Sequence, residues 1–241
     1  MNTKKPTIVI YKAIFGDYDK KPRPVPIILN KDIRFVLITD INIEVSGWEL
    51  LLVNKDNPVL NNRHCKMFPW KYFDADISLY LDGHIEFGKK FQEYLDQMIL
   101  NNHNFAVNRH RSKGKIVDEL IRCIDNSKLG KNQIASILSS DLILDAPSVE
   151  CGMIFRNHDN SNVREHANKW WWYFNNLCPR DQLSVQTAAR DSNIEITILD
   201  SDFSNKEYFE IVGHKNWFFT VIKARFKNAS RVFLKGTLLG D

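Results

Sequence analysis

The chain has 241 residues, 44% of them hydrophobic, and a formal net charge of +4. This length and apolar content are enough to bury a full core in one large or two small domains. The slight excess of basic residues is not gathered into a tail or dense run of the kind that nucleic-acid-binding proteins carry, so we expect no nucleic-acid partner.

The cysteines and the apolar runs indicate an intracellular protein. The four cysteines are widely separated and form no CxxC pair, which argues against a zinc site or a disulfide framework. The N-terminus is too polar for a signal peptide, and no run approaches the roughly 20 apolar residues that span a bilayer. We therefore expect a cytoplasmic location with reduced thiols.

Candidate strands and helices alternate along the chain. Apolar runs of strand length lie at residues 7–13, 33–39, 48–53, 77–81, 105–107, 150–155 and 194–199. Helical patterns lie at residues 61–68, 89–100, 117–124, 131–138, 163–177 and 181–190. This alternation predicts one α/β domain over residues 1–215, with a mostly parallel central sheet flanked by helices.

The strand expected at 77–81 ends in Asp82, Gly83 and His84. A strand end in an open α/β sheet is where ligands bind, because the loops there let backbone and side chains converge. An Asp-x-His pair at such a place can hold a divalent cation against a diphosphate. An ordinary polar turn is the alternative, because short motifs often occur by chance.

Other polar clusters also stand at the ends of expected strands or the starts of expected helices. With the Asp82 cluster there are five, and the other four are residues 16–19, 109–111, 156–158 and 180–182. One such cluster means little, but five suggest that their side chains share one crevice.

Several short motifs occur in an order that resembles a known family. They are Y-x-A-x-F-G-x-Y-D, a lysine-containing helix followed by h-h-D-G-x-I, then G-h-h-x-R-x-H, tryptophans and R-D-Q-h-S. The matching residues are 11–19, Lys66, 81–85, 152–158, Trp170 to Trp172 and 180–184, with a weaker echo of a further element at His110, Lys113, Asp118 and Glu119. This order is similar to that of the glycosyltransferase-like family DUF616.

The resemblance implies a GT-A-like, Rossmann-like fold that holds a nucleotide-sugar donor at the strand ends. The donor-binding residues that it indicates are Tyr11, Ala13, Gly16, Asp17, Lys66 and Asp82. We expect Tyr11 to stack on the nucleobase and Asp17 to bind a ribose hydroxyl. An ordinary β-turn is the alternative at Gly16 and Asp17, since this pair is favoured in turns.

We expect Mn²⁺ or Mg²⁺ as a cofactor. Asp82 and His84 are candidate ligands, and His214 resembles the late histidine that completes the metal site in many GT-A enzymes. A surface histidine is the alternative for His214. The ion would bridge Asp82 and the donor diphosphate and neutralise the leaving group.

Asp181 lies between Arg180 and Gln182 at the start of an expected helix. It is the candidate general base that takes a proton from an acceptor hydroxyl. The alternative is a carboxylate that favours the helix dipole. Arg180 and Gln182 are candidate acceptor contacts, as are Arg156 and His158, for which a surface turn is the alternative.

These residues predict transfer of a sugar from a nucleotide-diphosphate donor to a glycan or glycolipid acceptor. A metal-dependent hydrolase that uses Asp82, His84 and His158 is one alternative, although the histidines have no HExxH spacing. A non-catalytic sugar-binding module that uses Trp170 to Trp172 is another. Successive helical residues point about 100° apart, so plain packing is also expected of these tryptophans.

Residues 216–241 differ in character from the expected domain. Between residues 217 and 235, apolar and aromatic side chains recur at near-helical spacing among lysines and arginines. Such a segment can lie on an anionic membrane surface, which would place the protein at the inner membrane face beside a lipid-linked acceptor. A terminal helix that packs on the core or forms a dimer contact is the alternative.

Overall fold

The computed structural model describes residues 5–27, 29, 32–54, 57–200 and 205–213. His214 and the segment 216–241, including the expected membrane contact at 217–235, lie outside the described residues. Within those described ranges, no helix has the length and apolar content that crossing a membrane requires.

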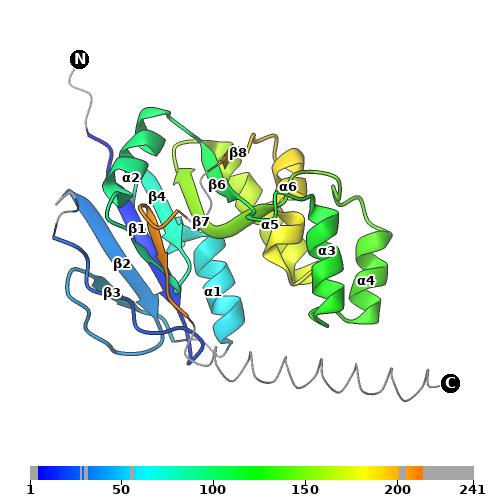
Figure 1. Ribbon diagram of the computed structural model, residues 1–241, viewed down its shortest axis with the longest axis horizontal. Coiled ribbons are helices and arrows are strands. Elements are labelled where there is room, and N and C mark those ends of the chain that lie inside the picture. Colours follow the sequence, from blue (N-terminus) through cyan, green and yellow to red (C-terminus); the bar gives the residue numbers. More distant parts are fainter. Residues whose placement is uncertain (1–4, 28, 30–31, 55–56, 201–204, 214–241) are drawn as a thin grey trace.

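The main sheet has seven strands in the order β3-β2-β1-β4-β7-β6-β8 (Figure 1). They are β1 (Ile8–Ile14), β2 (Ile33–Thr39), β3 (Glu49–Leu52), β4 (Ile77–Leu81), β6 (Phe105–Arg109), β7 (Val149–Asn157) and β8 (Thr197–Leu199). β7 runs antiparallel to its neighbours β4 and β6, and the other neighbouring pairs are parallel. The expected α/β fold with a mostly parallel sheet is therefore confirmed.

Helices flank this sheet. They are α1 (Pro58–Met67), α2 (Phe91–Leu100), α3 (Ile116–Asp125), α4 (Lys131–Leu138), α5 (Ser161–Asn176), α6 (Asp181–Asp191) and the short 3-10 helix η1 (Pro69–Lys71). α1 begins where the Asn57 side chain accepts hydrogen bonds from the backbone N–H groups of Val59 and Leu60. It ends before Pro69, because the residue that precedes a proline is biased away from helical geometry.

Alternate side chains of β1 enter two different cores, as the two-residue period of a strand requires. Val9 and Tyr11 face the core that α1, α5 and α6 cover. Ile8 and Ile10 face the opposite core, which α2 covers. The sheet is thus buried on both faces, which is the usual condition of a mostly parallel sheet.

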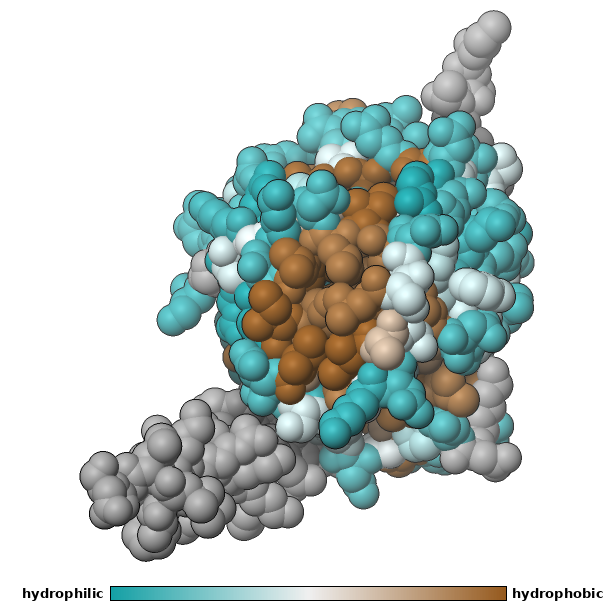
Figure 2. Space-filling view, turned by 90° about the vertical axis from the view of Figure 1, so that its right-hand side faces the viewer, coloured by the Kyte–Doolittle hydropathy of each residue, from teal (hydrophilic) through white to brown (hydrophobic). Residues whose placement is uncertain are grey.

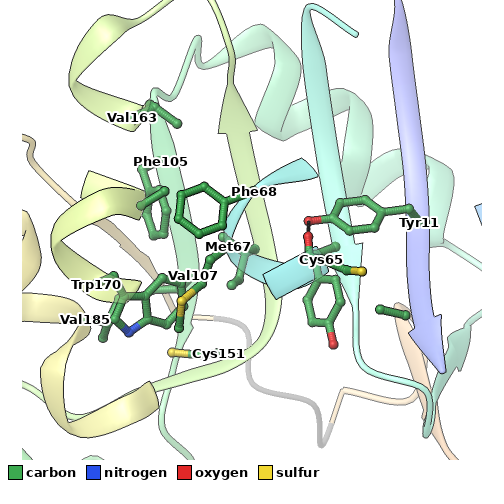
Figure 3. Close-up of a cluster of buried hydrophobic side chains, with 14 of the residues drawn as sticks. Tyr11, Cys65, Met67, Phe68, Phe105, Val107, Cys151, Val163, Trp170 and Val185 are labelled. Atoms are coloured by element: carbon green, nitrogen blue, oxygen red, sulfur yellow. Dashed lines mark hydrogen bonds between the residues drawn. The ribbon is translucent and has the colours of Figure 1, made fainter. Parts of the chain in front are cut away.

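Figure 3 shows the first core, in which Tyr11 of β1 points toward Cys65 of α1. Trp170 of α5 lies in the same core beside Val185 of α6, and Tyr11 and Trp170 are completely buried. The Trp170 indole N–H donates to the backbone oxygen of Asp181 at 2.9 Å. This hydrogen bond joins α5 to the first residue of α6.

A second, two-stranded sheet was not predicted from the sequence. It pairs β5 (Ile85–Phe87) with β9 (Phe209–Ile211) in antiparallel fashion. Gly88 follows β5 and donates its N–H to the oxygen of Tyr208 at 2.9 Å. A Cβ atom at Gly88 would lie 2.4 Å from the backbone oxygen of Glu207, so the close approach of these two segments requires glycine.

α3 and α4 form a smaller core with Cys178 and Leu183 beside the main sheet. Figure 2 looks onto the side of the molecule that carries α3 and α4 and shows a contiguous apolar area. The large exposed apolar side chains of these two helices are Ile121, Ile124 and Leu138.

Candidate functional site

The strand order of the main sheet reverses between β1 and β4. From β1 the chain adds β2 and β3 on one side, and it then places β4 on the other side of β1. Ligands of open α/β sheets bind at such a switch point, because the loops after the two strands diverge there. A cavity of about 320 Å³, here termed the inner chamber, is lined by Tyr18, Asp19, Asn62, Arg63, Lys66, Asp82, His84, Lys128, Cys151, Gly152, Arg180, Asp181 and Gln182.

Lys66, on the last turn of α1, lies between the Asp82 and Asp181 carboxylates of the inner chamber. Its Nζ is 2.8 Å from Asp181 Oδ2 and 3.6 Å from Asp82 Oδ1. Arg63, one turn earlier on the same side of α1, places its Nε 3.4 Å from Asp181 Oδ2. Two carboxylates from separate parts of the chain thus share a pair of cations from one helix. Two of the five polar clusters, those of Asp82 and Asp181, therefore meet in the inner chamber beside Lys66.

Asp82 stands in a tight turn directly after β4. Its N–H donates to the oxygen of Gly152 at 2.7 Å, and its own oxygen accepts from the N–H of Ile85 at 2.9 Å. The Tyr80 hydroxyl donates to Asp82 Oδ1 at 2.7 Å. Burial alone would raise the pKa of Asp82, but Lys66, together with His84, Arg63 and the Tyr80 hydrogen bond, outweighs burial and holds this pKa below its ordinary value. Asp82 is therefore a carboxylate at neutral pH.

Of the three residues expected to bind a metal, two line the inner chamber, and the third, His214, lies outside the described residues. Asp82 and His84 both line it, and the Asp82 side chain keeps 26% of its surface exposed. Across the described ranges, no three His, Cys, Asp or Glu side chains come close enough together to hold a metal ion. A hard carboxylate and an imidazole fit Mn²⁺ or Mg²⁺ as a partial ligand set. A donor diphosphate or groups outside the described residues would have to complete it.

Asp19 is a chamber residue that was not singled out from the sequence, although it is the last residue of the opening motif. A Cβ atom at Gly83 would lie 2.5 Å from Asp19 Oδ2, so the Asp19 carboxylate lies directly against the turn that carries Asp82 and His84. The absence of a side chain at Gly83 is what allows this approach.

Asp181, the candidate general base, lines the inner chamber at the first position of α6. Burial would raise its pKa, but Arg63 and Lys66 outweigh burial and hold the pKa of Asp181 far below its usual range. The Gln182 N–H also donates to Asp181 Oδ1 at 3.1 Å. Such a carboxylate is a weak proton acceptor near neutral pH, since a general base works best with a pKa near the working pH. Its part in proton transfer stays a prediction.

Other expected donor residues lie near the inner chamber without lining it. Ala13 is buried, and its backbone oxygen accepts from the Asn62 side chain at 2.7 Å. Gly16 adopts a positive φ of 63°, and its N–H donates to Asp40 Oδ1 at 3.0 Å. Asp17 is exposed on the same turn. These residues shape the turn that brings the next two, Tyr18 and Asp19, to the chamber.

Tyr11 has no exposed surface, so it cannot stack on a nucleobase in this structure as expected. Its hydroxyl donates to the backbone oxygens of Cys65 and Lys66, at 3.3 and 3.2 Å. A tyrosine at the middle of β1 therefore supports the end of α1 from the core side. Tyr11 thus has a structural role instead of the expected contact with the donor.

Arg156 and His158, expected to contact an acceptor, also lie in the core. β7 continues through Asn157, two residues further than expected, so Arg156 is a strand residue with no exposure. Its Nη2 donates to the Lys66 backbone oxygen at 2.8 Å. His158 Nε2 is 2.8 Å from the Ser78 hydroxyl, and burial lowers the pKa of His158 to about 4. Neither side chain reaches the chamber.

A larger cavity of about 750 Å³, here termed the outer chamber, adjoins the inner one. The two share His84, Lys128, Arg180 and Gln182. The other residues that line the outer chamber are His110, Arg111, Ser112, Glu119, Arg122, Asn126, Glu150 and Ile211. The polar cluster at 109–111, which had no assigned role, thus contributes to it. The two expected acceptor contacts Arg180 and Gln182 stand where the chambers meet.

A chain of polar contacts orients His110 in the outer chamber. Arg122 Nη1 donates to the Ser112 hydroxyl at 3.1 Å, and that hydroxyl lies 2.8 Å from His110 Nδ1. The Ser112 backbone N–H also donates to His110 Nδ1, at 3.2 Å. A neutral His110 therefore carries its proton on Nε2, which lies 3.8 Å from Glu150 Oε1. Glu150 is the acidic residue beside His110, and its Oε1 also accepts from the Arg111 backbone N–H at 3.3 Å.

The comparisons of this chain with known proteins give a distant likeness of fold. No family model matches it, and no curated protein matches it either. Its fold is similar to the crystal structure of 4-diphosphocytidyl-2C-methyl-D-erythritol synthase from Anaerococcus prevotii. That comparison has a TM-score of 0.46 and 9% identity, and it covers 90% of this chain and 96% of that chain. A likeness this distant carries no inference about activity, so a function has to be inferred from the chambers themselves.

Proposed function

We propose that this protein is a glycosyltransferase that moves a sugar from a nucleotide-diphosphate donor to a glycan or glycolipid acceptor. The observation that carries the proposal is the inner chamber, which stands at the switch point of the sheet with Asp82 and His84 at the end of β4. The motif order that resembles the DUF616 family supports it, because Lys66, Asp82 and Asp181 come from three of these motifs.

The inner chamber is suited to a diphosphate. Arg63, Lys128 and Arg180 line it and can neutralise phosphate oxygens, the arginines through paired N–H groups. The N-terminus of α6, which begins at Asp181, faces the same volume and favours negative charge. Mn²⁺ or Mg²⁺, held by Asp82 and His84, would supply further charge stabilisation for the departing diphosphate.

The protein's own residues prepare this environment before a donor binds. Lys66 and Arg63 help to keep both Asp82 and Asp181 ionised, so Asp82 needs no proton loss to bind a cation. Tyr80 and the tight turn after β4 orient Asp82 Oδ1, and about a quarter (26%) of the side chain stays exposed. Asp181 remains the proposed base for the acceptor hydroxyl.

A thermal-shift screen of nucleoside diphosphates, with and without Mn²⁺, tests the proposal. A ligand that binds the native state raises the melting temperature by mass action, so at least one nucleoside diphosphate should do so, and more strongly with Mn²⁺. Asp82→Asn should remove the Mn²⁺-dependent part of the shift. Asp96→Asn, on the exposed side of α2, removes the same charge elsewhere and should leave the shift unchanged.

The same screen separates the alternatives. A metal-dependent hydrolase would bind Mn²⁺ without any preference for a nucleoside diphosphate. A non-catalytic sugar-binding module would respond to free sugars and to neither of the other ligands. If no nucleoside diphosphate shifts the melting temperature at millimolar concentration, the glycosyltransferase proposal is wrong.

A further inference from the structure

The outer chamber has more cationic than acidic side chains. Four lysine and arginine residues line it, against two carboxylates, Glu119 and Glu150. Glu119 already forms ion pairs with Arg122 at 3.0 Å and with Arg180 at 3.9 Å. Glu150 has His110 Nε2 at 3.8 Å. The acidic groups are therefore matched within the chamber, and positive charge is left over.

Arg111 and Lys128 carry this surplus. Neither forms an ion pair with another residue in the described part of the chain. In addition, Arg122 Nη2 is buried and has no hydrogen-bond partner among the residues that the structure describes. That atom has almost no surface that a ligand could meet, but the rest of the Arg122 side chain lines the outer chamber and keeps 37% of its surface exposed.

The position of these groups separates them from the donor site. Lys128 lines both chambers, whereas Arg111 and Arg122 line the outer chamber alone. Positive charge thus extends into the outer chamber beyond the residues that the two chambers share. A donor diphosphate in the inner chamber would leave Arg111 without a negative partner, and Arg122 with only Glu119, which it shares with Arg180. A second ligand is needed to use them.

The remaining polar groups of the outer chamber suit sugar hydroxyls. Glu150 can accept a hydrogen bond from a hydroxyl, and the Gln182 and Asn126 amides can both donate and accept. A ligand with hydroxyls at one part and a negative charge at another would satisfy both kinds of lining. A neutral sugar would leave the charges of Arg111 and Lys128 unmatched, and a bare anion would make no use of the hydrogen-bonding groups of Glu150, Gln182 and Asn126.

We propose that the outer chamber binds the acceptor and that this acceptor carries an anionic group, a carboxylate or a phosphate, held by Arg111, Arg122 and Lys128. Naming this ligand the acceptor rests on the proposed glycosyltransferase function. The charge preference itself does not, because it follows from the side chains that line the outer chamber.

Calorimetric titrations of the full-length protein test the proposal with three probes: glucose 6-phosphate, glucuronate and glucose. Each is titrated without nucleotide and again with Mn²⁺ and the nucleoside diphosphate that shifts the melting temperature. Charge-assisted hydrogen bonds are the stronger kind, so at least one charged sugar should bind roughly tenfold more tightly than glucose. Raising the salt concentration should reduce that advantage.

Arg111→Gln is the informative variant, because Arg111 lies in the outer chamber alone and has no ion pair to lose. It should weaken binding of the charged sugar roughly five- to tenfold, with glucose and the nucleoside diphosphate unaffected. Lys131→Gln removes a charge from exposed α4 outside both chambers and should change none of the affinities.

Two results would overturn the proposal. Equal affinities for glucose and both charged sugars would show that the chamber has no anion preference. A loss of nucleoside diphosphate affinity in Arg111→Gln as large as the loss for the charged sugar would assign these cations to the donor. Absence of any nucleotide binding would instead refute the glycosyltransferase proposal, and the titrations without nucleotide would still decide the charge preference.

Discussion

Lys66 Nζ lies 2.8 Å from Asp181 Oδ2, and the two side chains are almost completely buried, with 2% and 6% of their surface exposed. The same ammonium group is 3.6 Å from Asp82 Oδ1. One lysine therefore joins the end of β4 to the start of α6. A buried charge is tolerated only when it is paired, so the inner chamber and the stability of the fold depend on the same ion pair.

Lys66→Met should destabilise the protein strongly. It leaves Asp181 buried with Arg63 as its remaining cation, and losing one partner of a buried ion pair costs about 3–5 kcal/mol of unfolding free energy. Urea unfolding measures this loss. Arg34→Met, which breaks the exposed pair between Arg34 and Glu49, is the matched control and should cost about 1 kcal/mol or less. Equal losses in the two variants would contradict the structural role of Lys66.

Asp181→Asn tests the proposed base. Asparagine can still accept a hydrogen bond from Lys66 but cannot take a proton, so turnover should fall by roughly 10²–10⁴-fold if Asp181 is the base. Donor binding should change far less, because the base acts on the acceptor. Turnover and nucleoside diphosphate affinity are measured on the same preparation.

The low pKa of Asp181 makes the opposite result informative. Equal losses in donor affinity and in turnover would show that Asp181 holds the cations of the donor site and is no proton acceptor. Glu150→Gln is then the next variant to measure, since Glu150 is the outer-chamber carboxylate that faces His110.

The local pattern of the sequence was enough to predict the fold class and the turn at Asp82. Apolar periodicity depends on residues that are close in the sequence. The strands of the main sheet and the helices that flank it are therefore found close to their expected bounds. β5 and β9 were missed because each has three residues and they pair only with one another, across more than half of the chain. Such pairing leaves no local signal.

The side-chain roles were harder to predict because exposure depends on the whole fold. Tyr11 and Arg156 stand in conspicuous motifs, yet both are buried beneath α1 and support the backbone of Lys66. The sequence does contain signals from which Arg63 and Asp19 could have been identified as site residues. Arg63 lies three residues before Lys66 on the same side of α1, and Asp19 ends the opening motif.

Two buried histidines should make the fold sensitive to mild acid. Burial lowers the pKa of His158 to about 4 and that of His166 to about 3. The unfolded chain binds these protons below about pH 6.5 and the folded chain does not, so stability is full above that pH and falls as the pH decreases toward 4. Each histidine should account for roughly 3–5 kcal/mol of unfolding free energy over its range.

Urea unfolding at several pH values between 7 and 4.5 measures this dependence. His158→Gln should be less stable at pH 7 but should show a shallower loss of stability toward low pH. The same change at the part-exposed His103 is the control for replacing a histidine by glutamine. A slope that is identical in the parent protein and His158→Gln would rule out this histidine as a cause of acid sensitivity.

Three glycine-to-alanine variants separate damage to the site from damage to the fold. At Gly83 the new Cβ would lie 2.5 Å from Asp19 Oδ2, a side-chain atom of the inner chamber. Gly83→Ala should therefore displace Asp19 and weaken nucleoside diphosphate binding by roughly tenfold or more, since misplaced site residues lose binding and rate steeply. The melting temperature should change little, because a side chain on a turn can move.

Gly88→Ala and Gly130→Ala provide the contrast. At Gly88 the Cβ would meet the backbone of Glu207 at 2.4 Å, and backbone cannot yield without separating β5 from β9. Overpacking of this kind costs about 1–3 kcal/mol, so Gly88→Ala should lower the melting temperature. Gly130 has its nearest atom at 3.7 Å, an ordinary contact, so its substitution meets no clash and should leave nucleoside diphosphate binding unaffected. If Gly83→Ala instead lost as much stability as Gly88→Ala, the Asp19 contact would be part of the fold and not a feature of the donor site.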